Sequence, residues 1–319
     1  MSQSQITIIG LGLIGTSLGL ALQRNENDFL IVGHDKDRSA TSQAKKLGAI
    51  DKSDWNLINA CDTADLILLA IPAAGIPPTL EIISGDLKPG CLIIDTATIK
   101  SPILEAATVL PDNVHFVGGD PVLSASNLTI EDASADLFKD GSWALCPTAD
   151  TAPDAIRIAS DLVISVGAHP FFLDAAEHDG LMAAVDGMPT LLSAAVVQAV
   201  SQSPAWREIR RMAGSQFETI TQLPGFSPAD FATAVQGNRD NIVYWIDAMI
   251  EELTEWKYAL QGAEEEAIVE RFADAIERRD QWLALRAKGE WEVSGSVQET
   301  PSLWRQMFGF GGRRSPDKS

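Results

Sequence analysis

The stretch Ile6-Thr7-Ile8-Ile9-Gly10-Leu11-Gly12-Leu13-Ile14-Gly15 decides the fold. Its first four residues are β-branched and predict a buried strand, and the apolar pattern from Leu13 to Gln23 predicts a helix directly after it. Between the two elements the glycines follow the spacing G-x-G-x-x-G. In this context the first glycine permits a tight turn, the second lets a pyrophosphate approach the backbone, and the third lets the helix pack against the strand. We therefore expect residues 10–15 to bind a dinucleotide.

Two further positions refine the cofactor prediction. Asp35 ends the second predicted strand, where its carboxylate can accept hydrogen bonds from ribose hydroxyls and disfavours a 2′-phosphate, which indicates NAD. Arg38 follows three residues later and can pair with such a phosphate, so NADP stays open. Ile71 and Pro72 follow another predicted strand and should lie at the same edge of the sheet, where ligands bind in open α/β folds.

Short β-rich runs alternate with helical segments through the first half of the chain. The predicted strands after the first cover residues 29–32, 66–70, 92–94, 114–117, 143–145 and 170–173. Strands separated by helices require crossover connections, so the pattern predicts an α/β fold with a doubly wound, mostly parallel sheet. We expect this dinucleotide-binding domain to cover residues 1–172.

The second half has a helical pattern and no convincing strand between residues 174 and 288. Apolar residues from Ile242 to Leu260 recur at spacings of three and four, which predicts a long amphipathic helix, and a second helix should follow Gly262. The segment 191–200 is apolar nearly all round, so we expect it to be buried on all sides, with help from a second subunit. We therefore expect an all-helical substrate and dimerisation domain over residues 173–289 and a homodimer. The remainder, residues 290–319, reads as a mobile tail.

Composition narrows the class of partner. The net charge of −20 and the acidic pI of about 4.5 disfavour nucleic acid and anionic membranes. The three cysteines are far apart and form no C-x-x-C pair, which predicts no metal site and fits a reducing compartment. No signal peptide is recognisable, and the most apolar later stretch contains Asp186 and Pro189 and is a poor membrane span. We expect a cytoplasmic protein that acts on a small molecule.

Several short motifs in a fixed order carry a family resemblance. They are G-L-G-L-I-G-T-S at 10–17, D-T-A-T-I-K at 95–100, F-V-G-G-D-P at 116–121, L-F at 137–138, W-A-L-C-P-T at 143–148, E-H-D at 177–179 and N-R at 238–239. From about residue 5 to residue 285 the chain resembles the prephenate/arogenate dehydrogenase family. The resemblance implies NAD(P)-dependent oxidative decarboxylation of a cyclohexadienol in tyrosine biosynthesis.

The chain departs from that family at three places. The resemblance implies a proton-accepting histidine in a G-G-H-P stretch, two histidines in an S-H-L-P-H stretch, and an arginine that binds a substrate carboxylate. Here Asp120 stands in the first stretch, residues 186–190 read D-G-M-P-T, and Gln222 falls where the arginine is expected. Thr98 stands where the family commonly has a serine and keeps the hydroxyl.

These substitutions can be weighed by their chemistry. We expect Asp120 to be catalytic, because a carboxylate can accept a proton from a hydroxyl when burial raises its pKa. We expect Thr98 to be catalytic as well, because it keeps the hydroxyl of the serine that the family commonly has there. Lys100, Asp186, Gln222 and Arg239 are the predicted substrate-binding residues, although a neutral Gln222 binds a carboxylate more weakly than arginine would. Asp120 and Asp186 together should repel a dianion such as prephenate and tolerate a zwitterion such as arogenate.

Other interpretations remain beside this one. Asp120 can be a turn cap, Asp186 a break in a helix, and His178, placed between two acids at a helix start, a surface or structural residue. The pocket can also serve a dehydrogenase for another small hydroxy acid. A third alternative is a catalytically inactive dinucleotide-binding protein that acts as a sensor or subunit.

Overall fold

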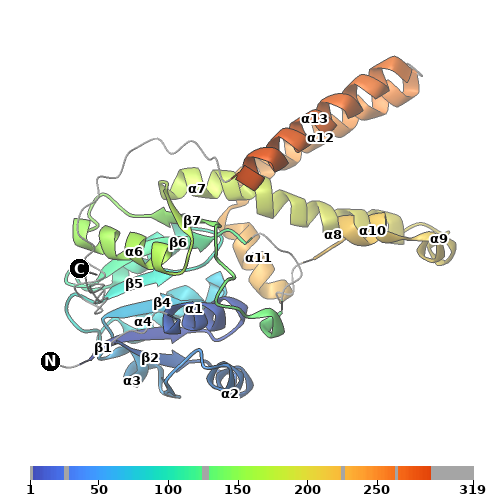
Figure 1. Ribbon diagram of the computed structural model, residues 1–319. Coiled ribbons are helices and arrows are strands. Elements are labelled where there is room, and N and C mark those ends of the chain that lie inside the picture. The colour runs from blue at the N-terminus through green and yellow to red at the C-terminus, as the bar shows by residue number, and fades with distance from the viewer. Residues whose placement is uncertain (1–2, 25–28, 124–128, 224–226, 263–264, 289–319) are drawn as a thin grey trace, which may run out of the picture. The chain divides into compact units, whose positions relative to one another are not determined.

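The computed structural model describes residues 3–24, 29–123, 129–223, 227–262 and 265–288. They divide into two compact units, one ending at Arg239 and one beginning at Asp240. The predicted tail at residues 290–319 lies outside the described residues. Among the described residues the first unit contains a sheet flanked by helices (Figure 1).

Within the described residues the sheet has eight strands in the order β3-β2-β1-β4-β5-β6-β7-β8, and the β6–β7 pair is the antiparallel one among them. The strands are β1 (Ser4–Ile9), β2 (Phe29–His34), β3 (Lys52–Ser53), β4 (Leu66–Leu69), β5 (Leu92–Asp95), β6 (His115–Pro121), β7 (Ser142–Cys146) and β8 (His169–Phe172). Because β1, β4, β5 and β6 are parallel neighbours, their carboxyl ends meet at one edge of the sheet. That edge carries every site residue discussed below that follows a strand.

Helices cover both faces of the sheet. The α-helices of this unit are α1 (Leu13–Gln23), α2 (Arg38–Leu47), α3 (Leu57–Cys61), α4 (Ile76–Ile83), α5 (Ser101–Ala106), α6 (Pro153–Ser165), α7 (Ala175–Met182), α8 (Met188–Ser201), α9 (Trp206–Met212), α10 (Ser215–Ile220) and α11 (Pro228–Gly237). Short 3-10 turns lie at Ala73–Gly75 (η1), Ala107–Val109 (η2) and Ile130–Asp132 (η3), and a π-helical turn at Ala183–Gly187 (η4) joins α7 to α8.

Alternation along the strands divides the core into two layers. Ile6 and Ile8 of β1 pack with α1 and α6, whereas Ile9 packs with α3, α4 and α5 on the other face. Both layers are apolar and buried, as expected for a parallel sheet covered on both sides. The predicted doubly wound sheet is therefore confirmed, and each predicted strand is present within a few residues of its expected ends.

The second unit contains two long helices, α12 (Arg239–Gly262, whose first residue belongs to the first unit) and α13 (Glu265–Lys288). They pack through Trp256 and Phe272, whose ring centroids are 4.8 Å apart, and Arg271 lies over the Trp256 ring. The predicted break near Gly262 separates them. On α12 the apolar residues Val243, Ile250, Leu253 and Leu260 remain exposed.

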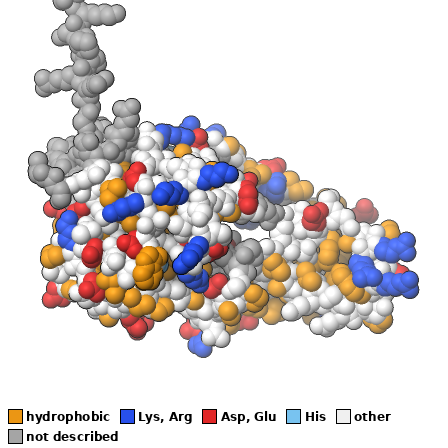
Figure 2. Space-filling view, turned by 90° about the horizontal axis from the view of Figure 1, so that it is seen from below, with side chains coloured by type: hydrophobic (Ala, Val, Ile, Leu, Met, Phe, Trp, Pro, Cys, Tyr) orange, Lys and Arg blue, Asp and Glu red, His pale blue; other side chains and the backbone are white. Residues whose placement is uncertain are grey.

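The single chain does not by itself bury the helix that was expected to be buried with help from a second subunit. The segment 191–200 was expected to be buried on all sides, yet of the α8 residues only Thr190 is buried. Apolar side chains gather on the surface over α8 to α10 (Figure 2), where Leu181, Val185 and Met212 are exposed nearby. The composition of α8 indicated an apolar environment, but this chain alone does not supply it.

Candidate active site

The glycine-rich turn forms a bare backbone cradle at the end of β1. Gly10 has a φ of +91°, and a Cβ there would lie 2.3 Å from the carbonyl oxygen of Ala70. A Cβ on Gly15 would lie 1.8 Å from the carbonyl oxygen of Gly10. Both positions therefore require glycine for the packing of this chain itself. Ile71 and Pro72 follow β4 directly beside the turn, because Ala70 contacts Gly10 and Gly15.

Gly12 has a different reason for lacking a side chain. A Cβ there would meet no protein atom within 4 Å, so open space lies in front of it. Gly12 is also the N-cap of α1, where no side chain caps the helix and no acidic residue occupies the first turn. The free N–H groups and the positive end of the helix dipole suit a pyrophosphate, which fits the site that the sequence predicts.

Asp35 holds the turn and its own loop together. One carboxylate oxygen accepts from the backbone N–H of Leu11 at 2.7 Å and the other from that of Asp37 at 2.7 Å. Asp35 is half-buried, and Arg38 is exposed at the start of α2. The carboxylate thus lies next to the phosphate cradle, at the end of the strand where a ribose is expected to bind.

A buried ion pair underlies the neighbouring part of the edge. Asp95 at the end of β5 and Lys100, five residues later, are both fully buried and paired. The Lys100 ammonium also donates to the Gly119 carbonyl at 2.7 Å, while Asp95 accepts from the N–H groups of Ala97 and Gly119. Lys100 was expected to contact substrate, but here its charge is used within the protein and fixes the loop to β6.

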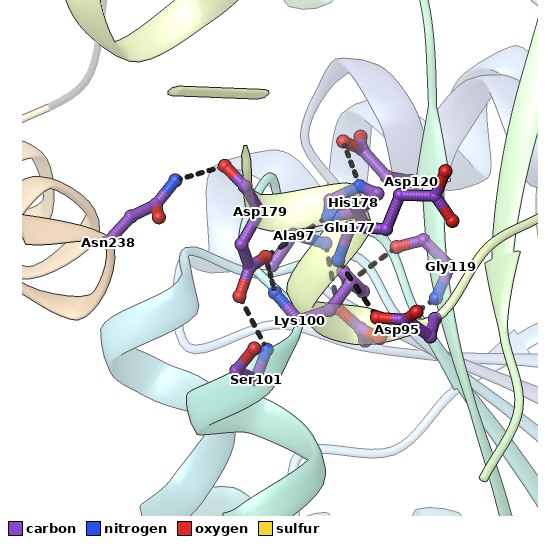
Figure 3. A network of polar contacts seen from close by, with 11 residues as sticks. Asp95, Ala97, Lys100, Ser101, Gly119, Asp120, Glu177, His178, Asp179 and Asn238 are labelled. Atoms are coloured by element: carbon purple, nitrogen blue, oxygen red, sulfur yellow. Dashed lines mark hydrogen bonds and ion pairs between the residues drawn. The ribbon is translucent and has the colours of Figure 1, made fainter. Parts of the chain in front are cut away.

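Asp120 on β6 faces helix α7 (Figure 3). Its Oδ2 lies 3.2 Å from Nε2 of His178, and the other ring nitrogen of His178 lies 3.1 Å from Oδ1 of Asp179. The three side chains are nearly completely buried. Asp179 in turn accepts from the backbone N–H groups of Lys100 at 2.6 Å and Ser101 at 2.8 Å. The β5 loop, β6 and α7 thereby form one polar cluster.

Burial and neighbouring charges shift the pKa values in this cluster. Burial raises the pKa of Asp120 above its ordinary range, although the hydrogen bond and charge of His178 and the charge of Lys100 oppose the rise. Burial works against a charged His178, but hydrogen bonds to Asp120 and Asp179 outweigh it and raise the pKa of the imidazole. Burial disfavours ionised Asp179, yet its hydrogen bonds with His178, Ser101 and Lys100 lower its pKa. Perturbed pKa values of this kind in one buried cluster are typical of sites that hold and exchange a proton.

Asp186 lies on the π-helical turn η4, a type of turn that recurs at functional sites. The side chain keeps an exposed surface, yet crowding by protein atoms and repulsion from Asp120 raise its pKa. The two carboxylates predicted from the sequence to share one neighbourhood are therefore close enough to interact. Thr98 is half-buried in the loop between Asp95 and Lys100.

Two predicted substrate-binding residues are exposed on the helical part of the chain. Gln222 is exposed after α10, and Arg239 is exposed at the start of α12. Asn238, which precedes Arg239, is buried and donates through its side chain to the Asp179 carbonyl at 2.7 Å. The buried end of the N-R motif therefore supports α7.

Four members of the cluster were not singled out as site residues from the sequence. They are Asp95, His178, Asp179 and Asn238. His178 was interpreted as a surface or structural residue, and the structure excludes the surface alternative because only 2% of it is exposed. The D-T-A-T-I-K and E-H-D motifs contain three of the four, so their placement after a strand and at a helix start was the available signal.

The parallel sheet, the glycine turn and Asp35 define a dinucleotide-binding Rossmann protein with a second, polar site at the same edge. Comparison with known families gives the particular group. Residues 18–171 match the family model described as "Prephenate dehydrogenase, nucleotide-binding domain", and residues 174–274 match "Prephenate dehydrogenase, dimerization domain". The chain belongs to the prephenate dehydrogenase family of nicotinamide-dependent oxidoreductases.

Individual relatives agree with this assignment. The chain is 29% identical to the prephenate dehydrogenase of Bacillus subtilis, over 91% of this chain and 79% of the relative. It is 24% identical to the cyclohexadienyl dehydrogenase of Zymomonas mobilis, over 88% and 96%. Prephenate dehydrogenase from Aquifex aeolicus, solved with hydroxyphenyl propionate and NAD+, has the same fold with a TM-score of 0.79 at 21% identity, covering 88% of this chain and 99% of that one.

Proposed function

We propose that this protein is an NAD-dependent dehydrogenase that oxidatively decarboxylates a cyclohexadienol of the prephenate or arogenate type, a step of tyrosine biosynthesis. The observation that carries the proposal is the position of the buried carboxylate Asp120 at the same sheet edge as the glycine cradle. Bound NAD+ supplies the hydride acceptor. Asp35, beside the cradle, favours ribose hydroxyls over a 2′-phosphate and so favours NAD over NADP.

Asp120 is the proposed proton acceptor for the substrate hydroxyl. Among the described residues no hydrogen bond uses its Oδ1, so this oxygen remains for a substrate while Oδ2 faces His178. Thr98 brings a hydroxyl to the neighbouring loop and is a proposed second catalytic residue. Asp186, Gln222 and Arg239 are the proposed substrate contacts. Lys100 stabilises the site through its buried contacts with Asp95 and the Gly119 carbonyl.

The substrate preference follows from charge. Asp120 and Asp186 interact repulsively already in the absence of substrate, so a dianion would add to an unfavourable negative potential. An ammonium on the substrate would instead be attracted. We therefore propose that arogenate is a better substrate than prephenate.

Steady-state kinetics test this proposal directly. We expect kcat/KM for arogenate to exceed that for prephenate by about tenfold or more, which corresponds to about 1.4 kcal/mol. Asp186→Asn is the informative variant, because it removes one of the two charges without changing the shape, and it should narrow the ratio. A clear preference of the unmodified protein for prephenate would overturn the proposed specificity.

The assembly is also a proposal. Among the described residues, one helical segment, Ala175–Ser201, is long enough and apolar enough to cross a membrane by length and composition alone. Only 11% of its most apolar stretch is buried within this chain. The same residues match a dimerization domain, and Asp186 interrupts their apolar run. We propose that a second copy of the chain covers this surface. We also propose that the boundary between the dinucleotide-binding domain and the helical domain lies between residues 172 and 173. The proposed location of the enzyme is the cytoplasm.

A further inference from the structure

His178 lies between two carboxylates that approach opposite nitrogens of its ring. Asp120 lies 3.2 Å from Nε2 and Asp179 lies 3.1 Å from Nδ1. A neutral imidazole has one N–H and can donate to only one of them, whereas an imidazolium donates to both. With both carboxylates ionised, the geometry therefore favours the charged form of the ring.

Asp179 is held in place from three directions. The backbone N–H groups of Lys100 and Ser101 bind its two oxygens, and the side chain of Asn238 binds its peptide carbonyl. These contacts fix the carboxylate, which then fixes the orientation of the ring plane. The orientation of His178 toward Asp120 is thus built into the loop after β5 and into helix α7.

The other charges near Asp120 and His178 determine how strongly the imidazolium favours the ionised form of Asp120. The charge of Lys100 acts on both Asp120 and His178, but its ammonium is paired with the buried Asp95. Asp95 and Asp186 both repel a charge on Asp120. His178 is consequently the one cation in direct contact with Asp120 among the described residues, and it opposes the burial that favours a protonated carboxyl.

We propose that His178 is a positioning residue whose imidazolium keeps the buried Asp120 ionised, so that Asp120 can accept a proton from the substrate. The inference rests on the proposed function for the identity of the reaction. It adds a residue that acts through Asp120 and does not itself touch the substrate. Ionised Asp120 and Asp179 with protonated His178 carry one net negative charge, and uptake of one proton by Asp120 neutralises this group.

The step balances without another reactant. As the C4–H bond breaks, its electron pair leaves as hydride to NAD+, and the O–H electron pair forms the C4 carbonyl while its proton moves to Oδ1 of Asp120. The bond from the ring to the carboxylate then breaks, releasing CO2, and its electron pair aromatises the ring and leaves a phenolate oxygen. Asp120 returns the proton to that oxygen. The site therefore ends in the protonation state in which it began.

Imidazole NMR on the protein without substrate tests the pairing independently of activity. The protein has four histidines, so variants His34→Gln, His115→Gln and His169→Gln assign the remaining resonance to His178 by elimination. We expect His178 to stay protonated above the ordinary histidine pKa of 6.5, and Asp120→Asn to return its titration toward lower pH. A His178 ring that is neutral at pH 7, or one that ignores Asp120→Asn, would overturn the proposal.

The pH profile of kcat/KM tests the consequence for catalysis. His178→Gln keeps a side-chain N–H for Asp120 but removes the charge, so protonation of Asp120 should persist to higher pH. We expect the acidic limb to move upward by about 1–3 pH units, as removal of an adjacent opposite charge does, with activity recovering at alkaline pH. His169→Gln, an exposed histidine on β8, is the matched control and should leave the profile unchanged.

The outcomes separate the two proposals. A lower kcat in His178→Gln with an unshifted acidic limb would mean a structural role and would contradict the positioning role. If no cyclohexadienol is oxidised, the proposed function fails, while the NMR titration still decides whether His178 is an imidazolium. Should His178→Gln not fold, the NMR titration of Asp120→Asn decides the question without it.

Discussion

A buried carboxylate accepts a proton only when its surroundings keep it ionised. At Asp120 two effects compete, because burial favours the neutral carboxyl and His178 favours the charged one. The net effect raises the pKa of Asp120 above that of an exposed aspartate, and the charge of His178 keeps the carboxylate available as a base. A poorly basic side chain thereby becomes suited to the transfer of a hydroxyl proton.

Asp120→Asn tests the acceptor role. Asparagine has nearly the same shape but does not accept the proton, so we expect kcat to fall by about 10²–10⁴-fold. The affinity for NAD+ measured by calorimetry should not change, because the glycine cradle is unaltered. Asp112→Asn, an exposed acid, is the matched control. Near-normal turnover in Asp120→Asn would remove Asp120 from the mechanism.

Gly12→Ala tests the cofactor cradle. An added methyl group meets no protein atom, so the chain should fold, but it would occupy the space that the pyrophosphate needs. We expect NAD+ affinity to fall at least about tenfold, or about 1.4 kcal/mol. Gly214→Ala is a close control, since Gly214 is also a helix N-cap with open space at its Cβ. Equal NAD+ affinity in the two variants would contradict the predicted site.

The residues differ in how far the sequence could reveal them. The glycine turn is visible because its function depends on six consecutive residues and their neighbouring strand and helix. The contact between His178 and Asp120 joins residues 58 positions apart, and that between Asp179 and Lys100 joins residues 79 apart. Their meeting depends on how α7 packs on β6, which no local pattern specifies. The order of motifs identified the family but did not assign these contacts.

At the scale of elements, strands buried on both faces were the easiest to predict. Short continuous apolar runs between turn residues are typical of strands that are buried on both faces, and β1, β4 and β5 lie where the sequence predicts them. The two-residue β3 has no such signal, because both its residues are exposed. For α8, composition predicts an apolar environment, and within the described residues this chain does not supply it.

The exposed stripe on α12 gives a prediction about assembly. Val243, Ile250, Leu253 and Leu260 recur at spacings of seven and three and therefore share one face of the helix. We propose that this stripe also contacts the second copy, so Leu253→Glu, which places a charge on it, should shift the protein from dimer to monomer in light scattering. Tyr258→Glu, on another face of the same helix, should leave the dimer intact. A monomeric unmodified protein would contradict the assembly proposal.

At the scale of the whole molecule, one sheet edge brings two functions together. The ends of β1 and β4 form the cofactor cradle, and the ends of β5 and β6 carry Asp95 and Asp120. Parallel strand order alone places these pairs side by side, which is why the general location of the site followed from the sequence. The chemical detail did not, because it depends on the substituted residues and their charges.

The most direct test of the central claim counts two products in one reaction. The protein, NAD+ and arogenate are mixed, and NADH and CO2 are measured over the same time course. The account predicts equal amounts of the two, formed at the same rate. NADH without CO2 would mean that arogenate is oxidised without decarboxylation and would contradict the proposed reaction. The formation of neither product with arogenate or prephenate, despite NAD+ binding, would contradict it as well.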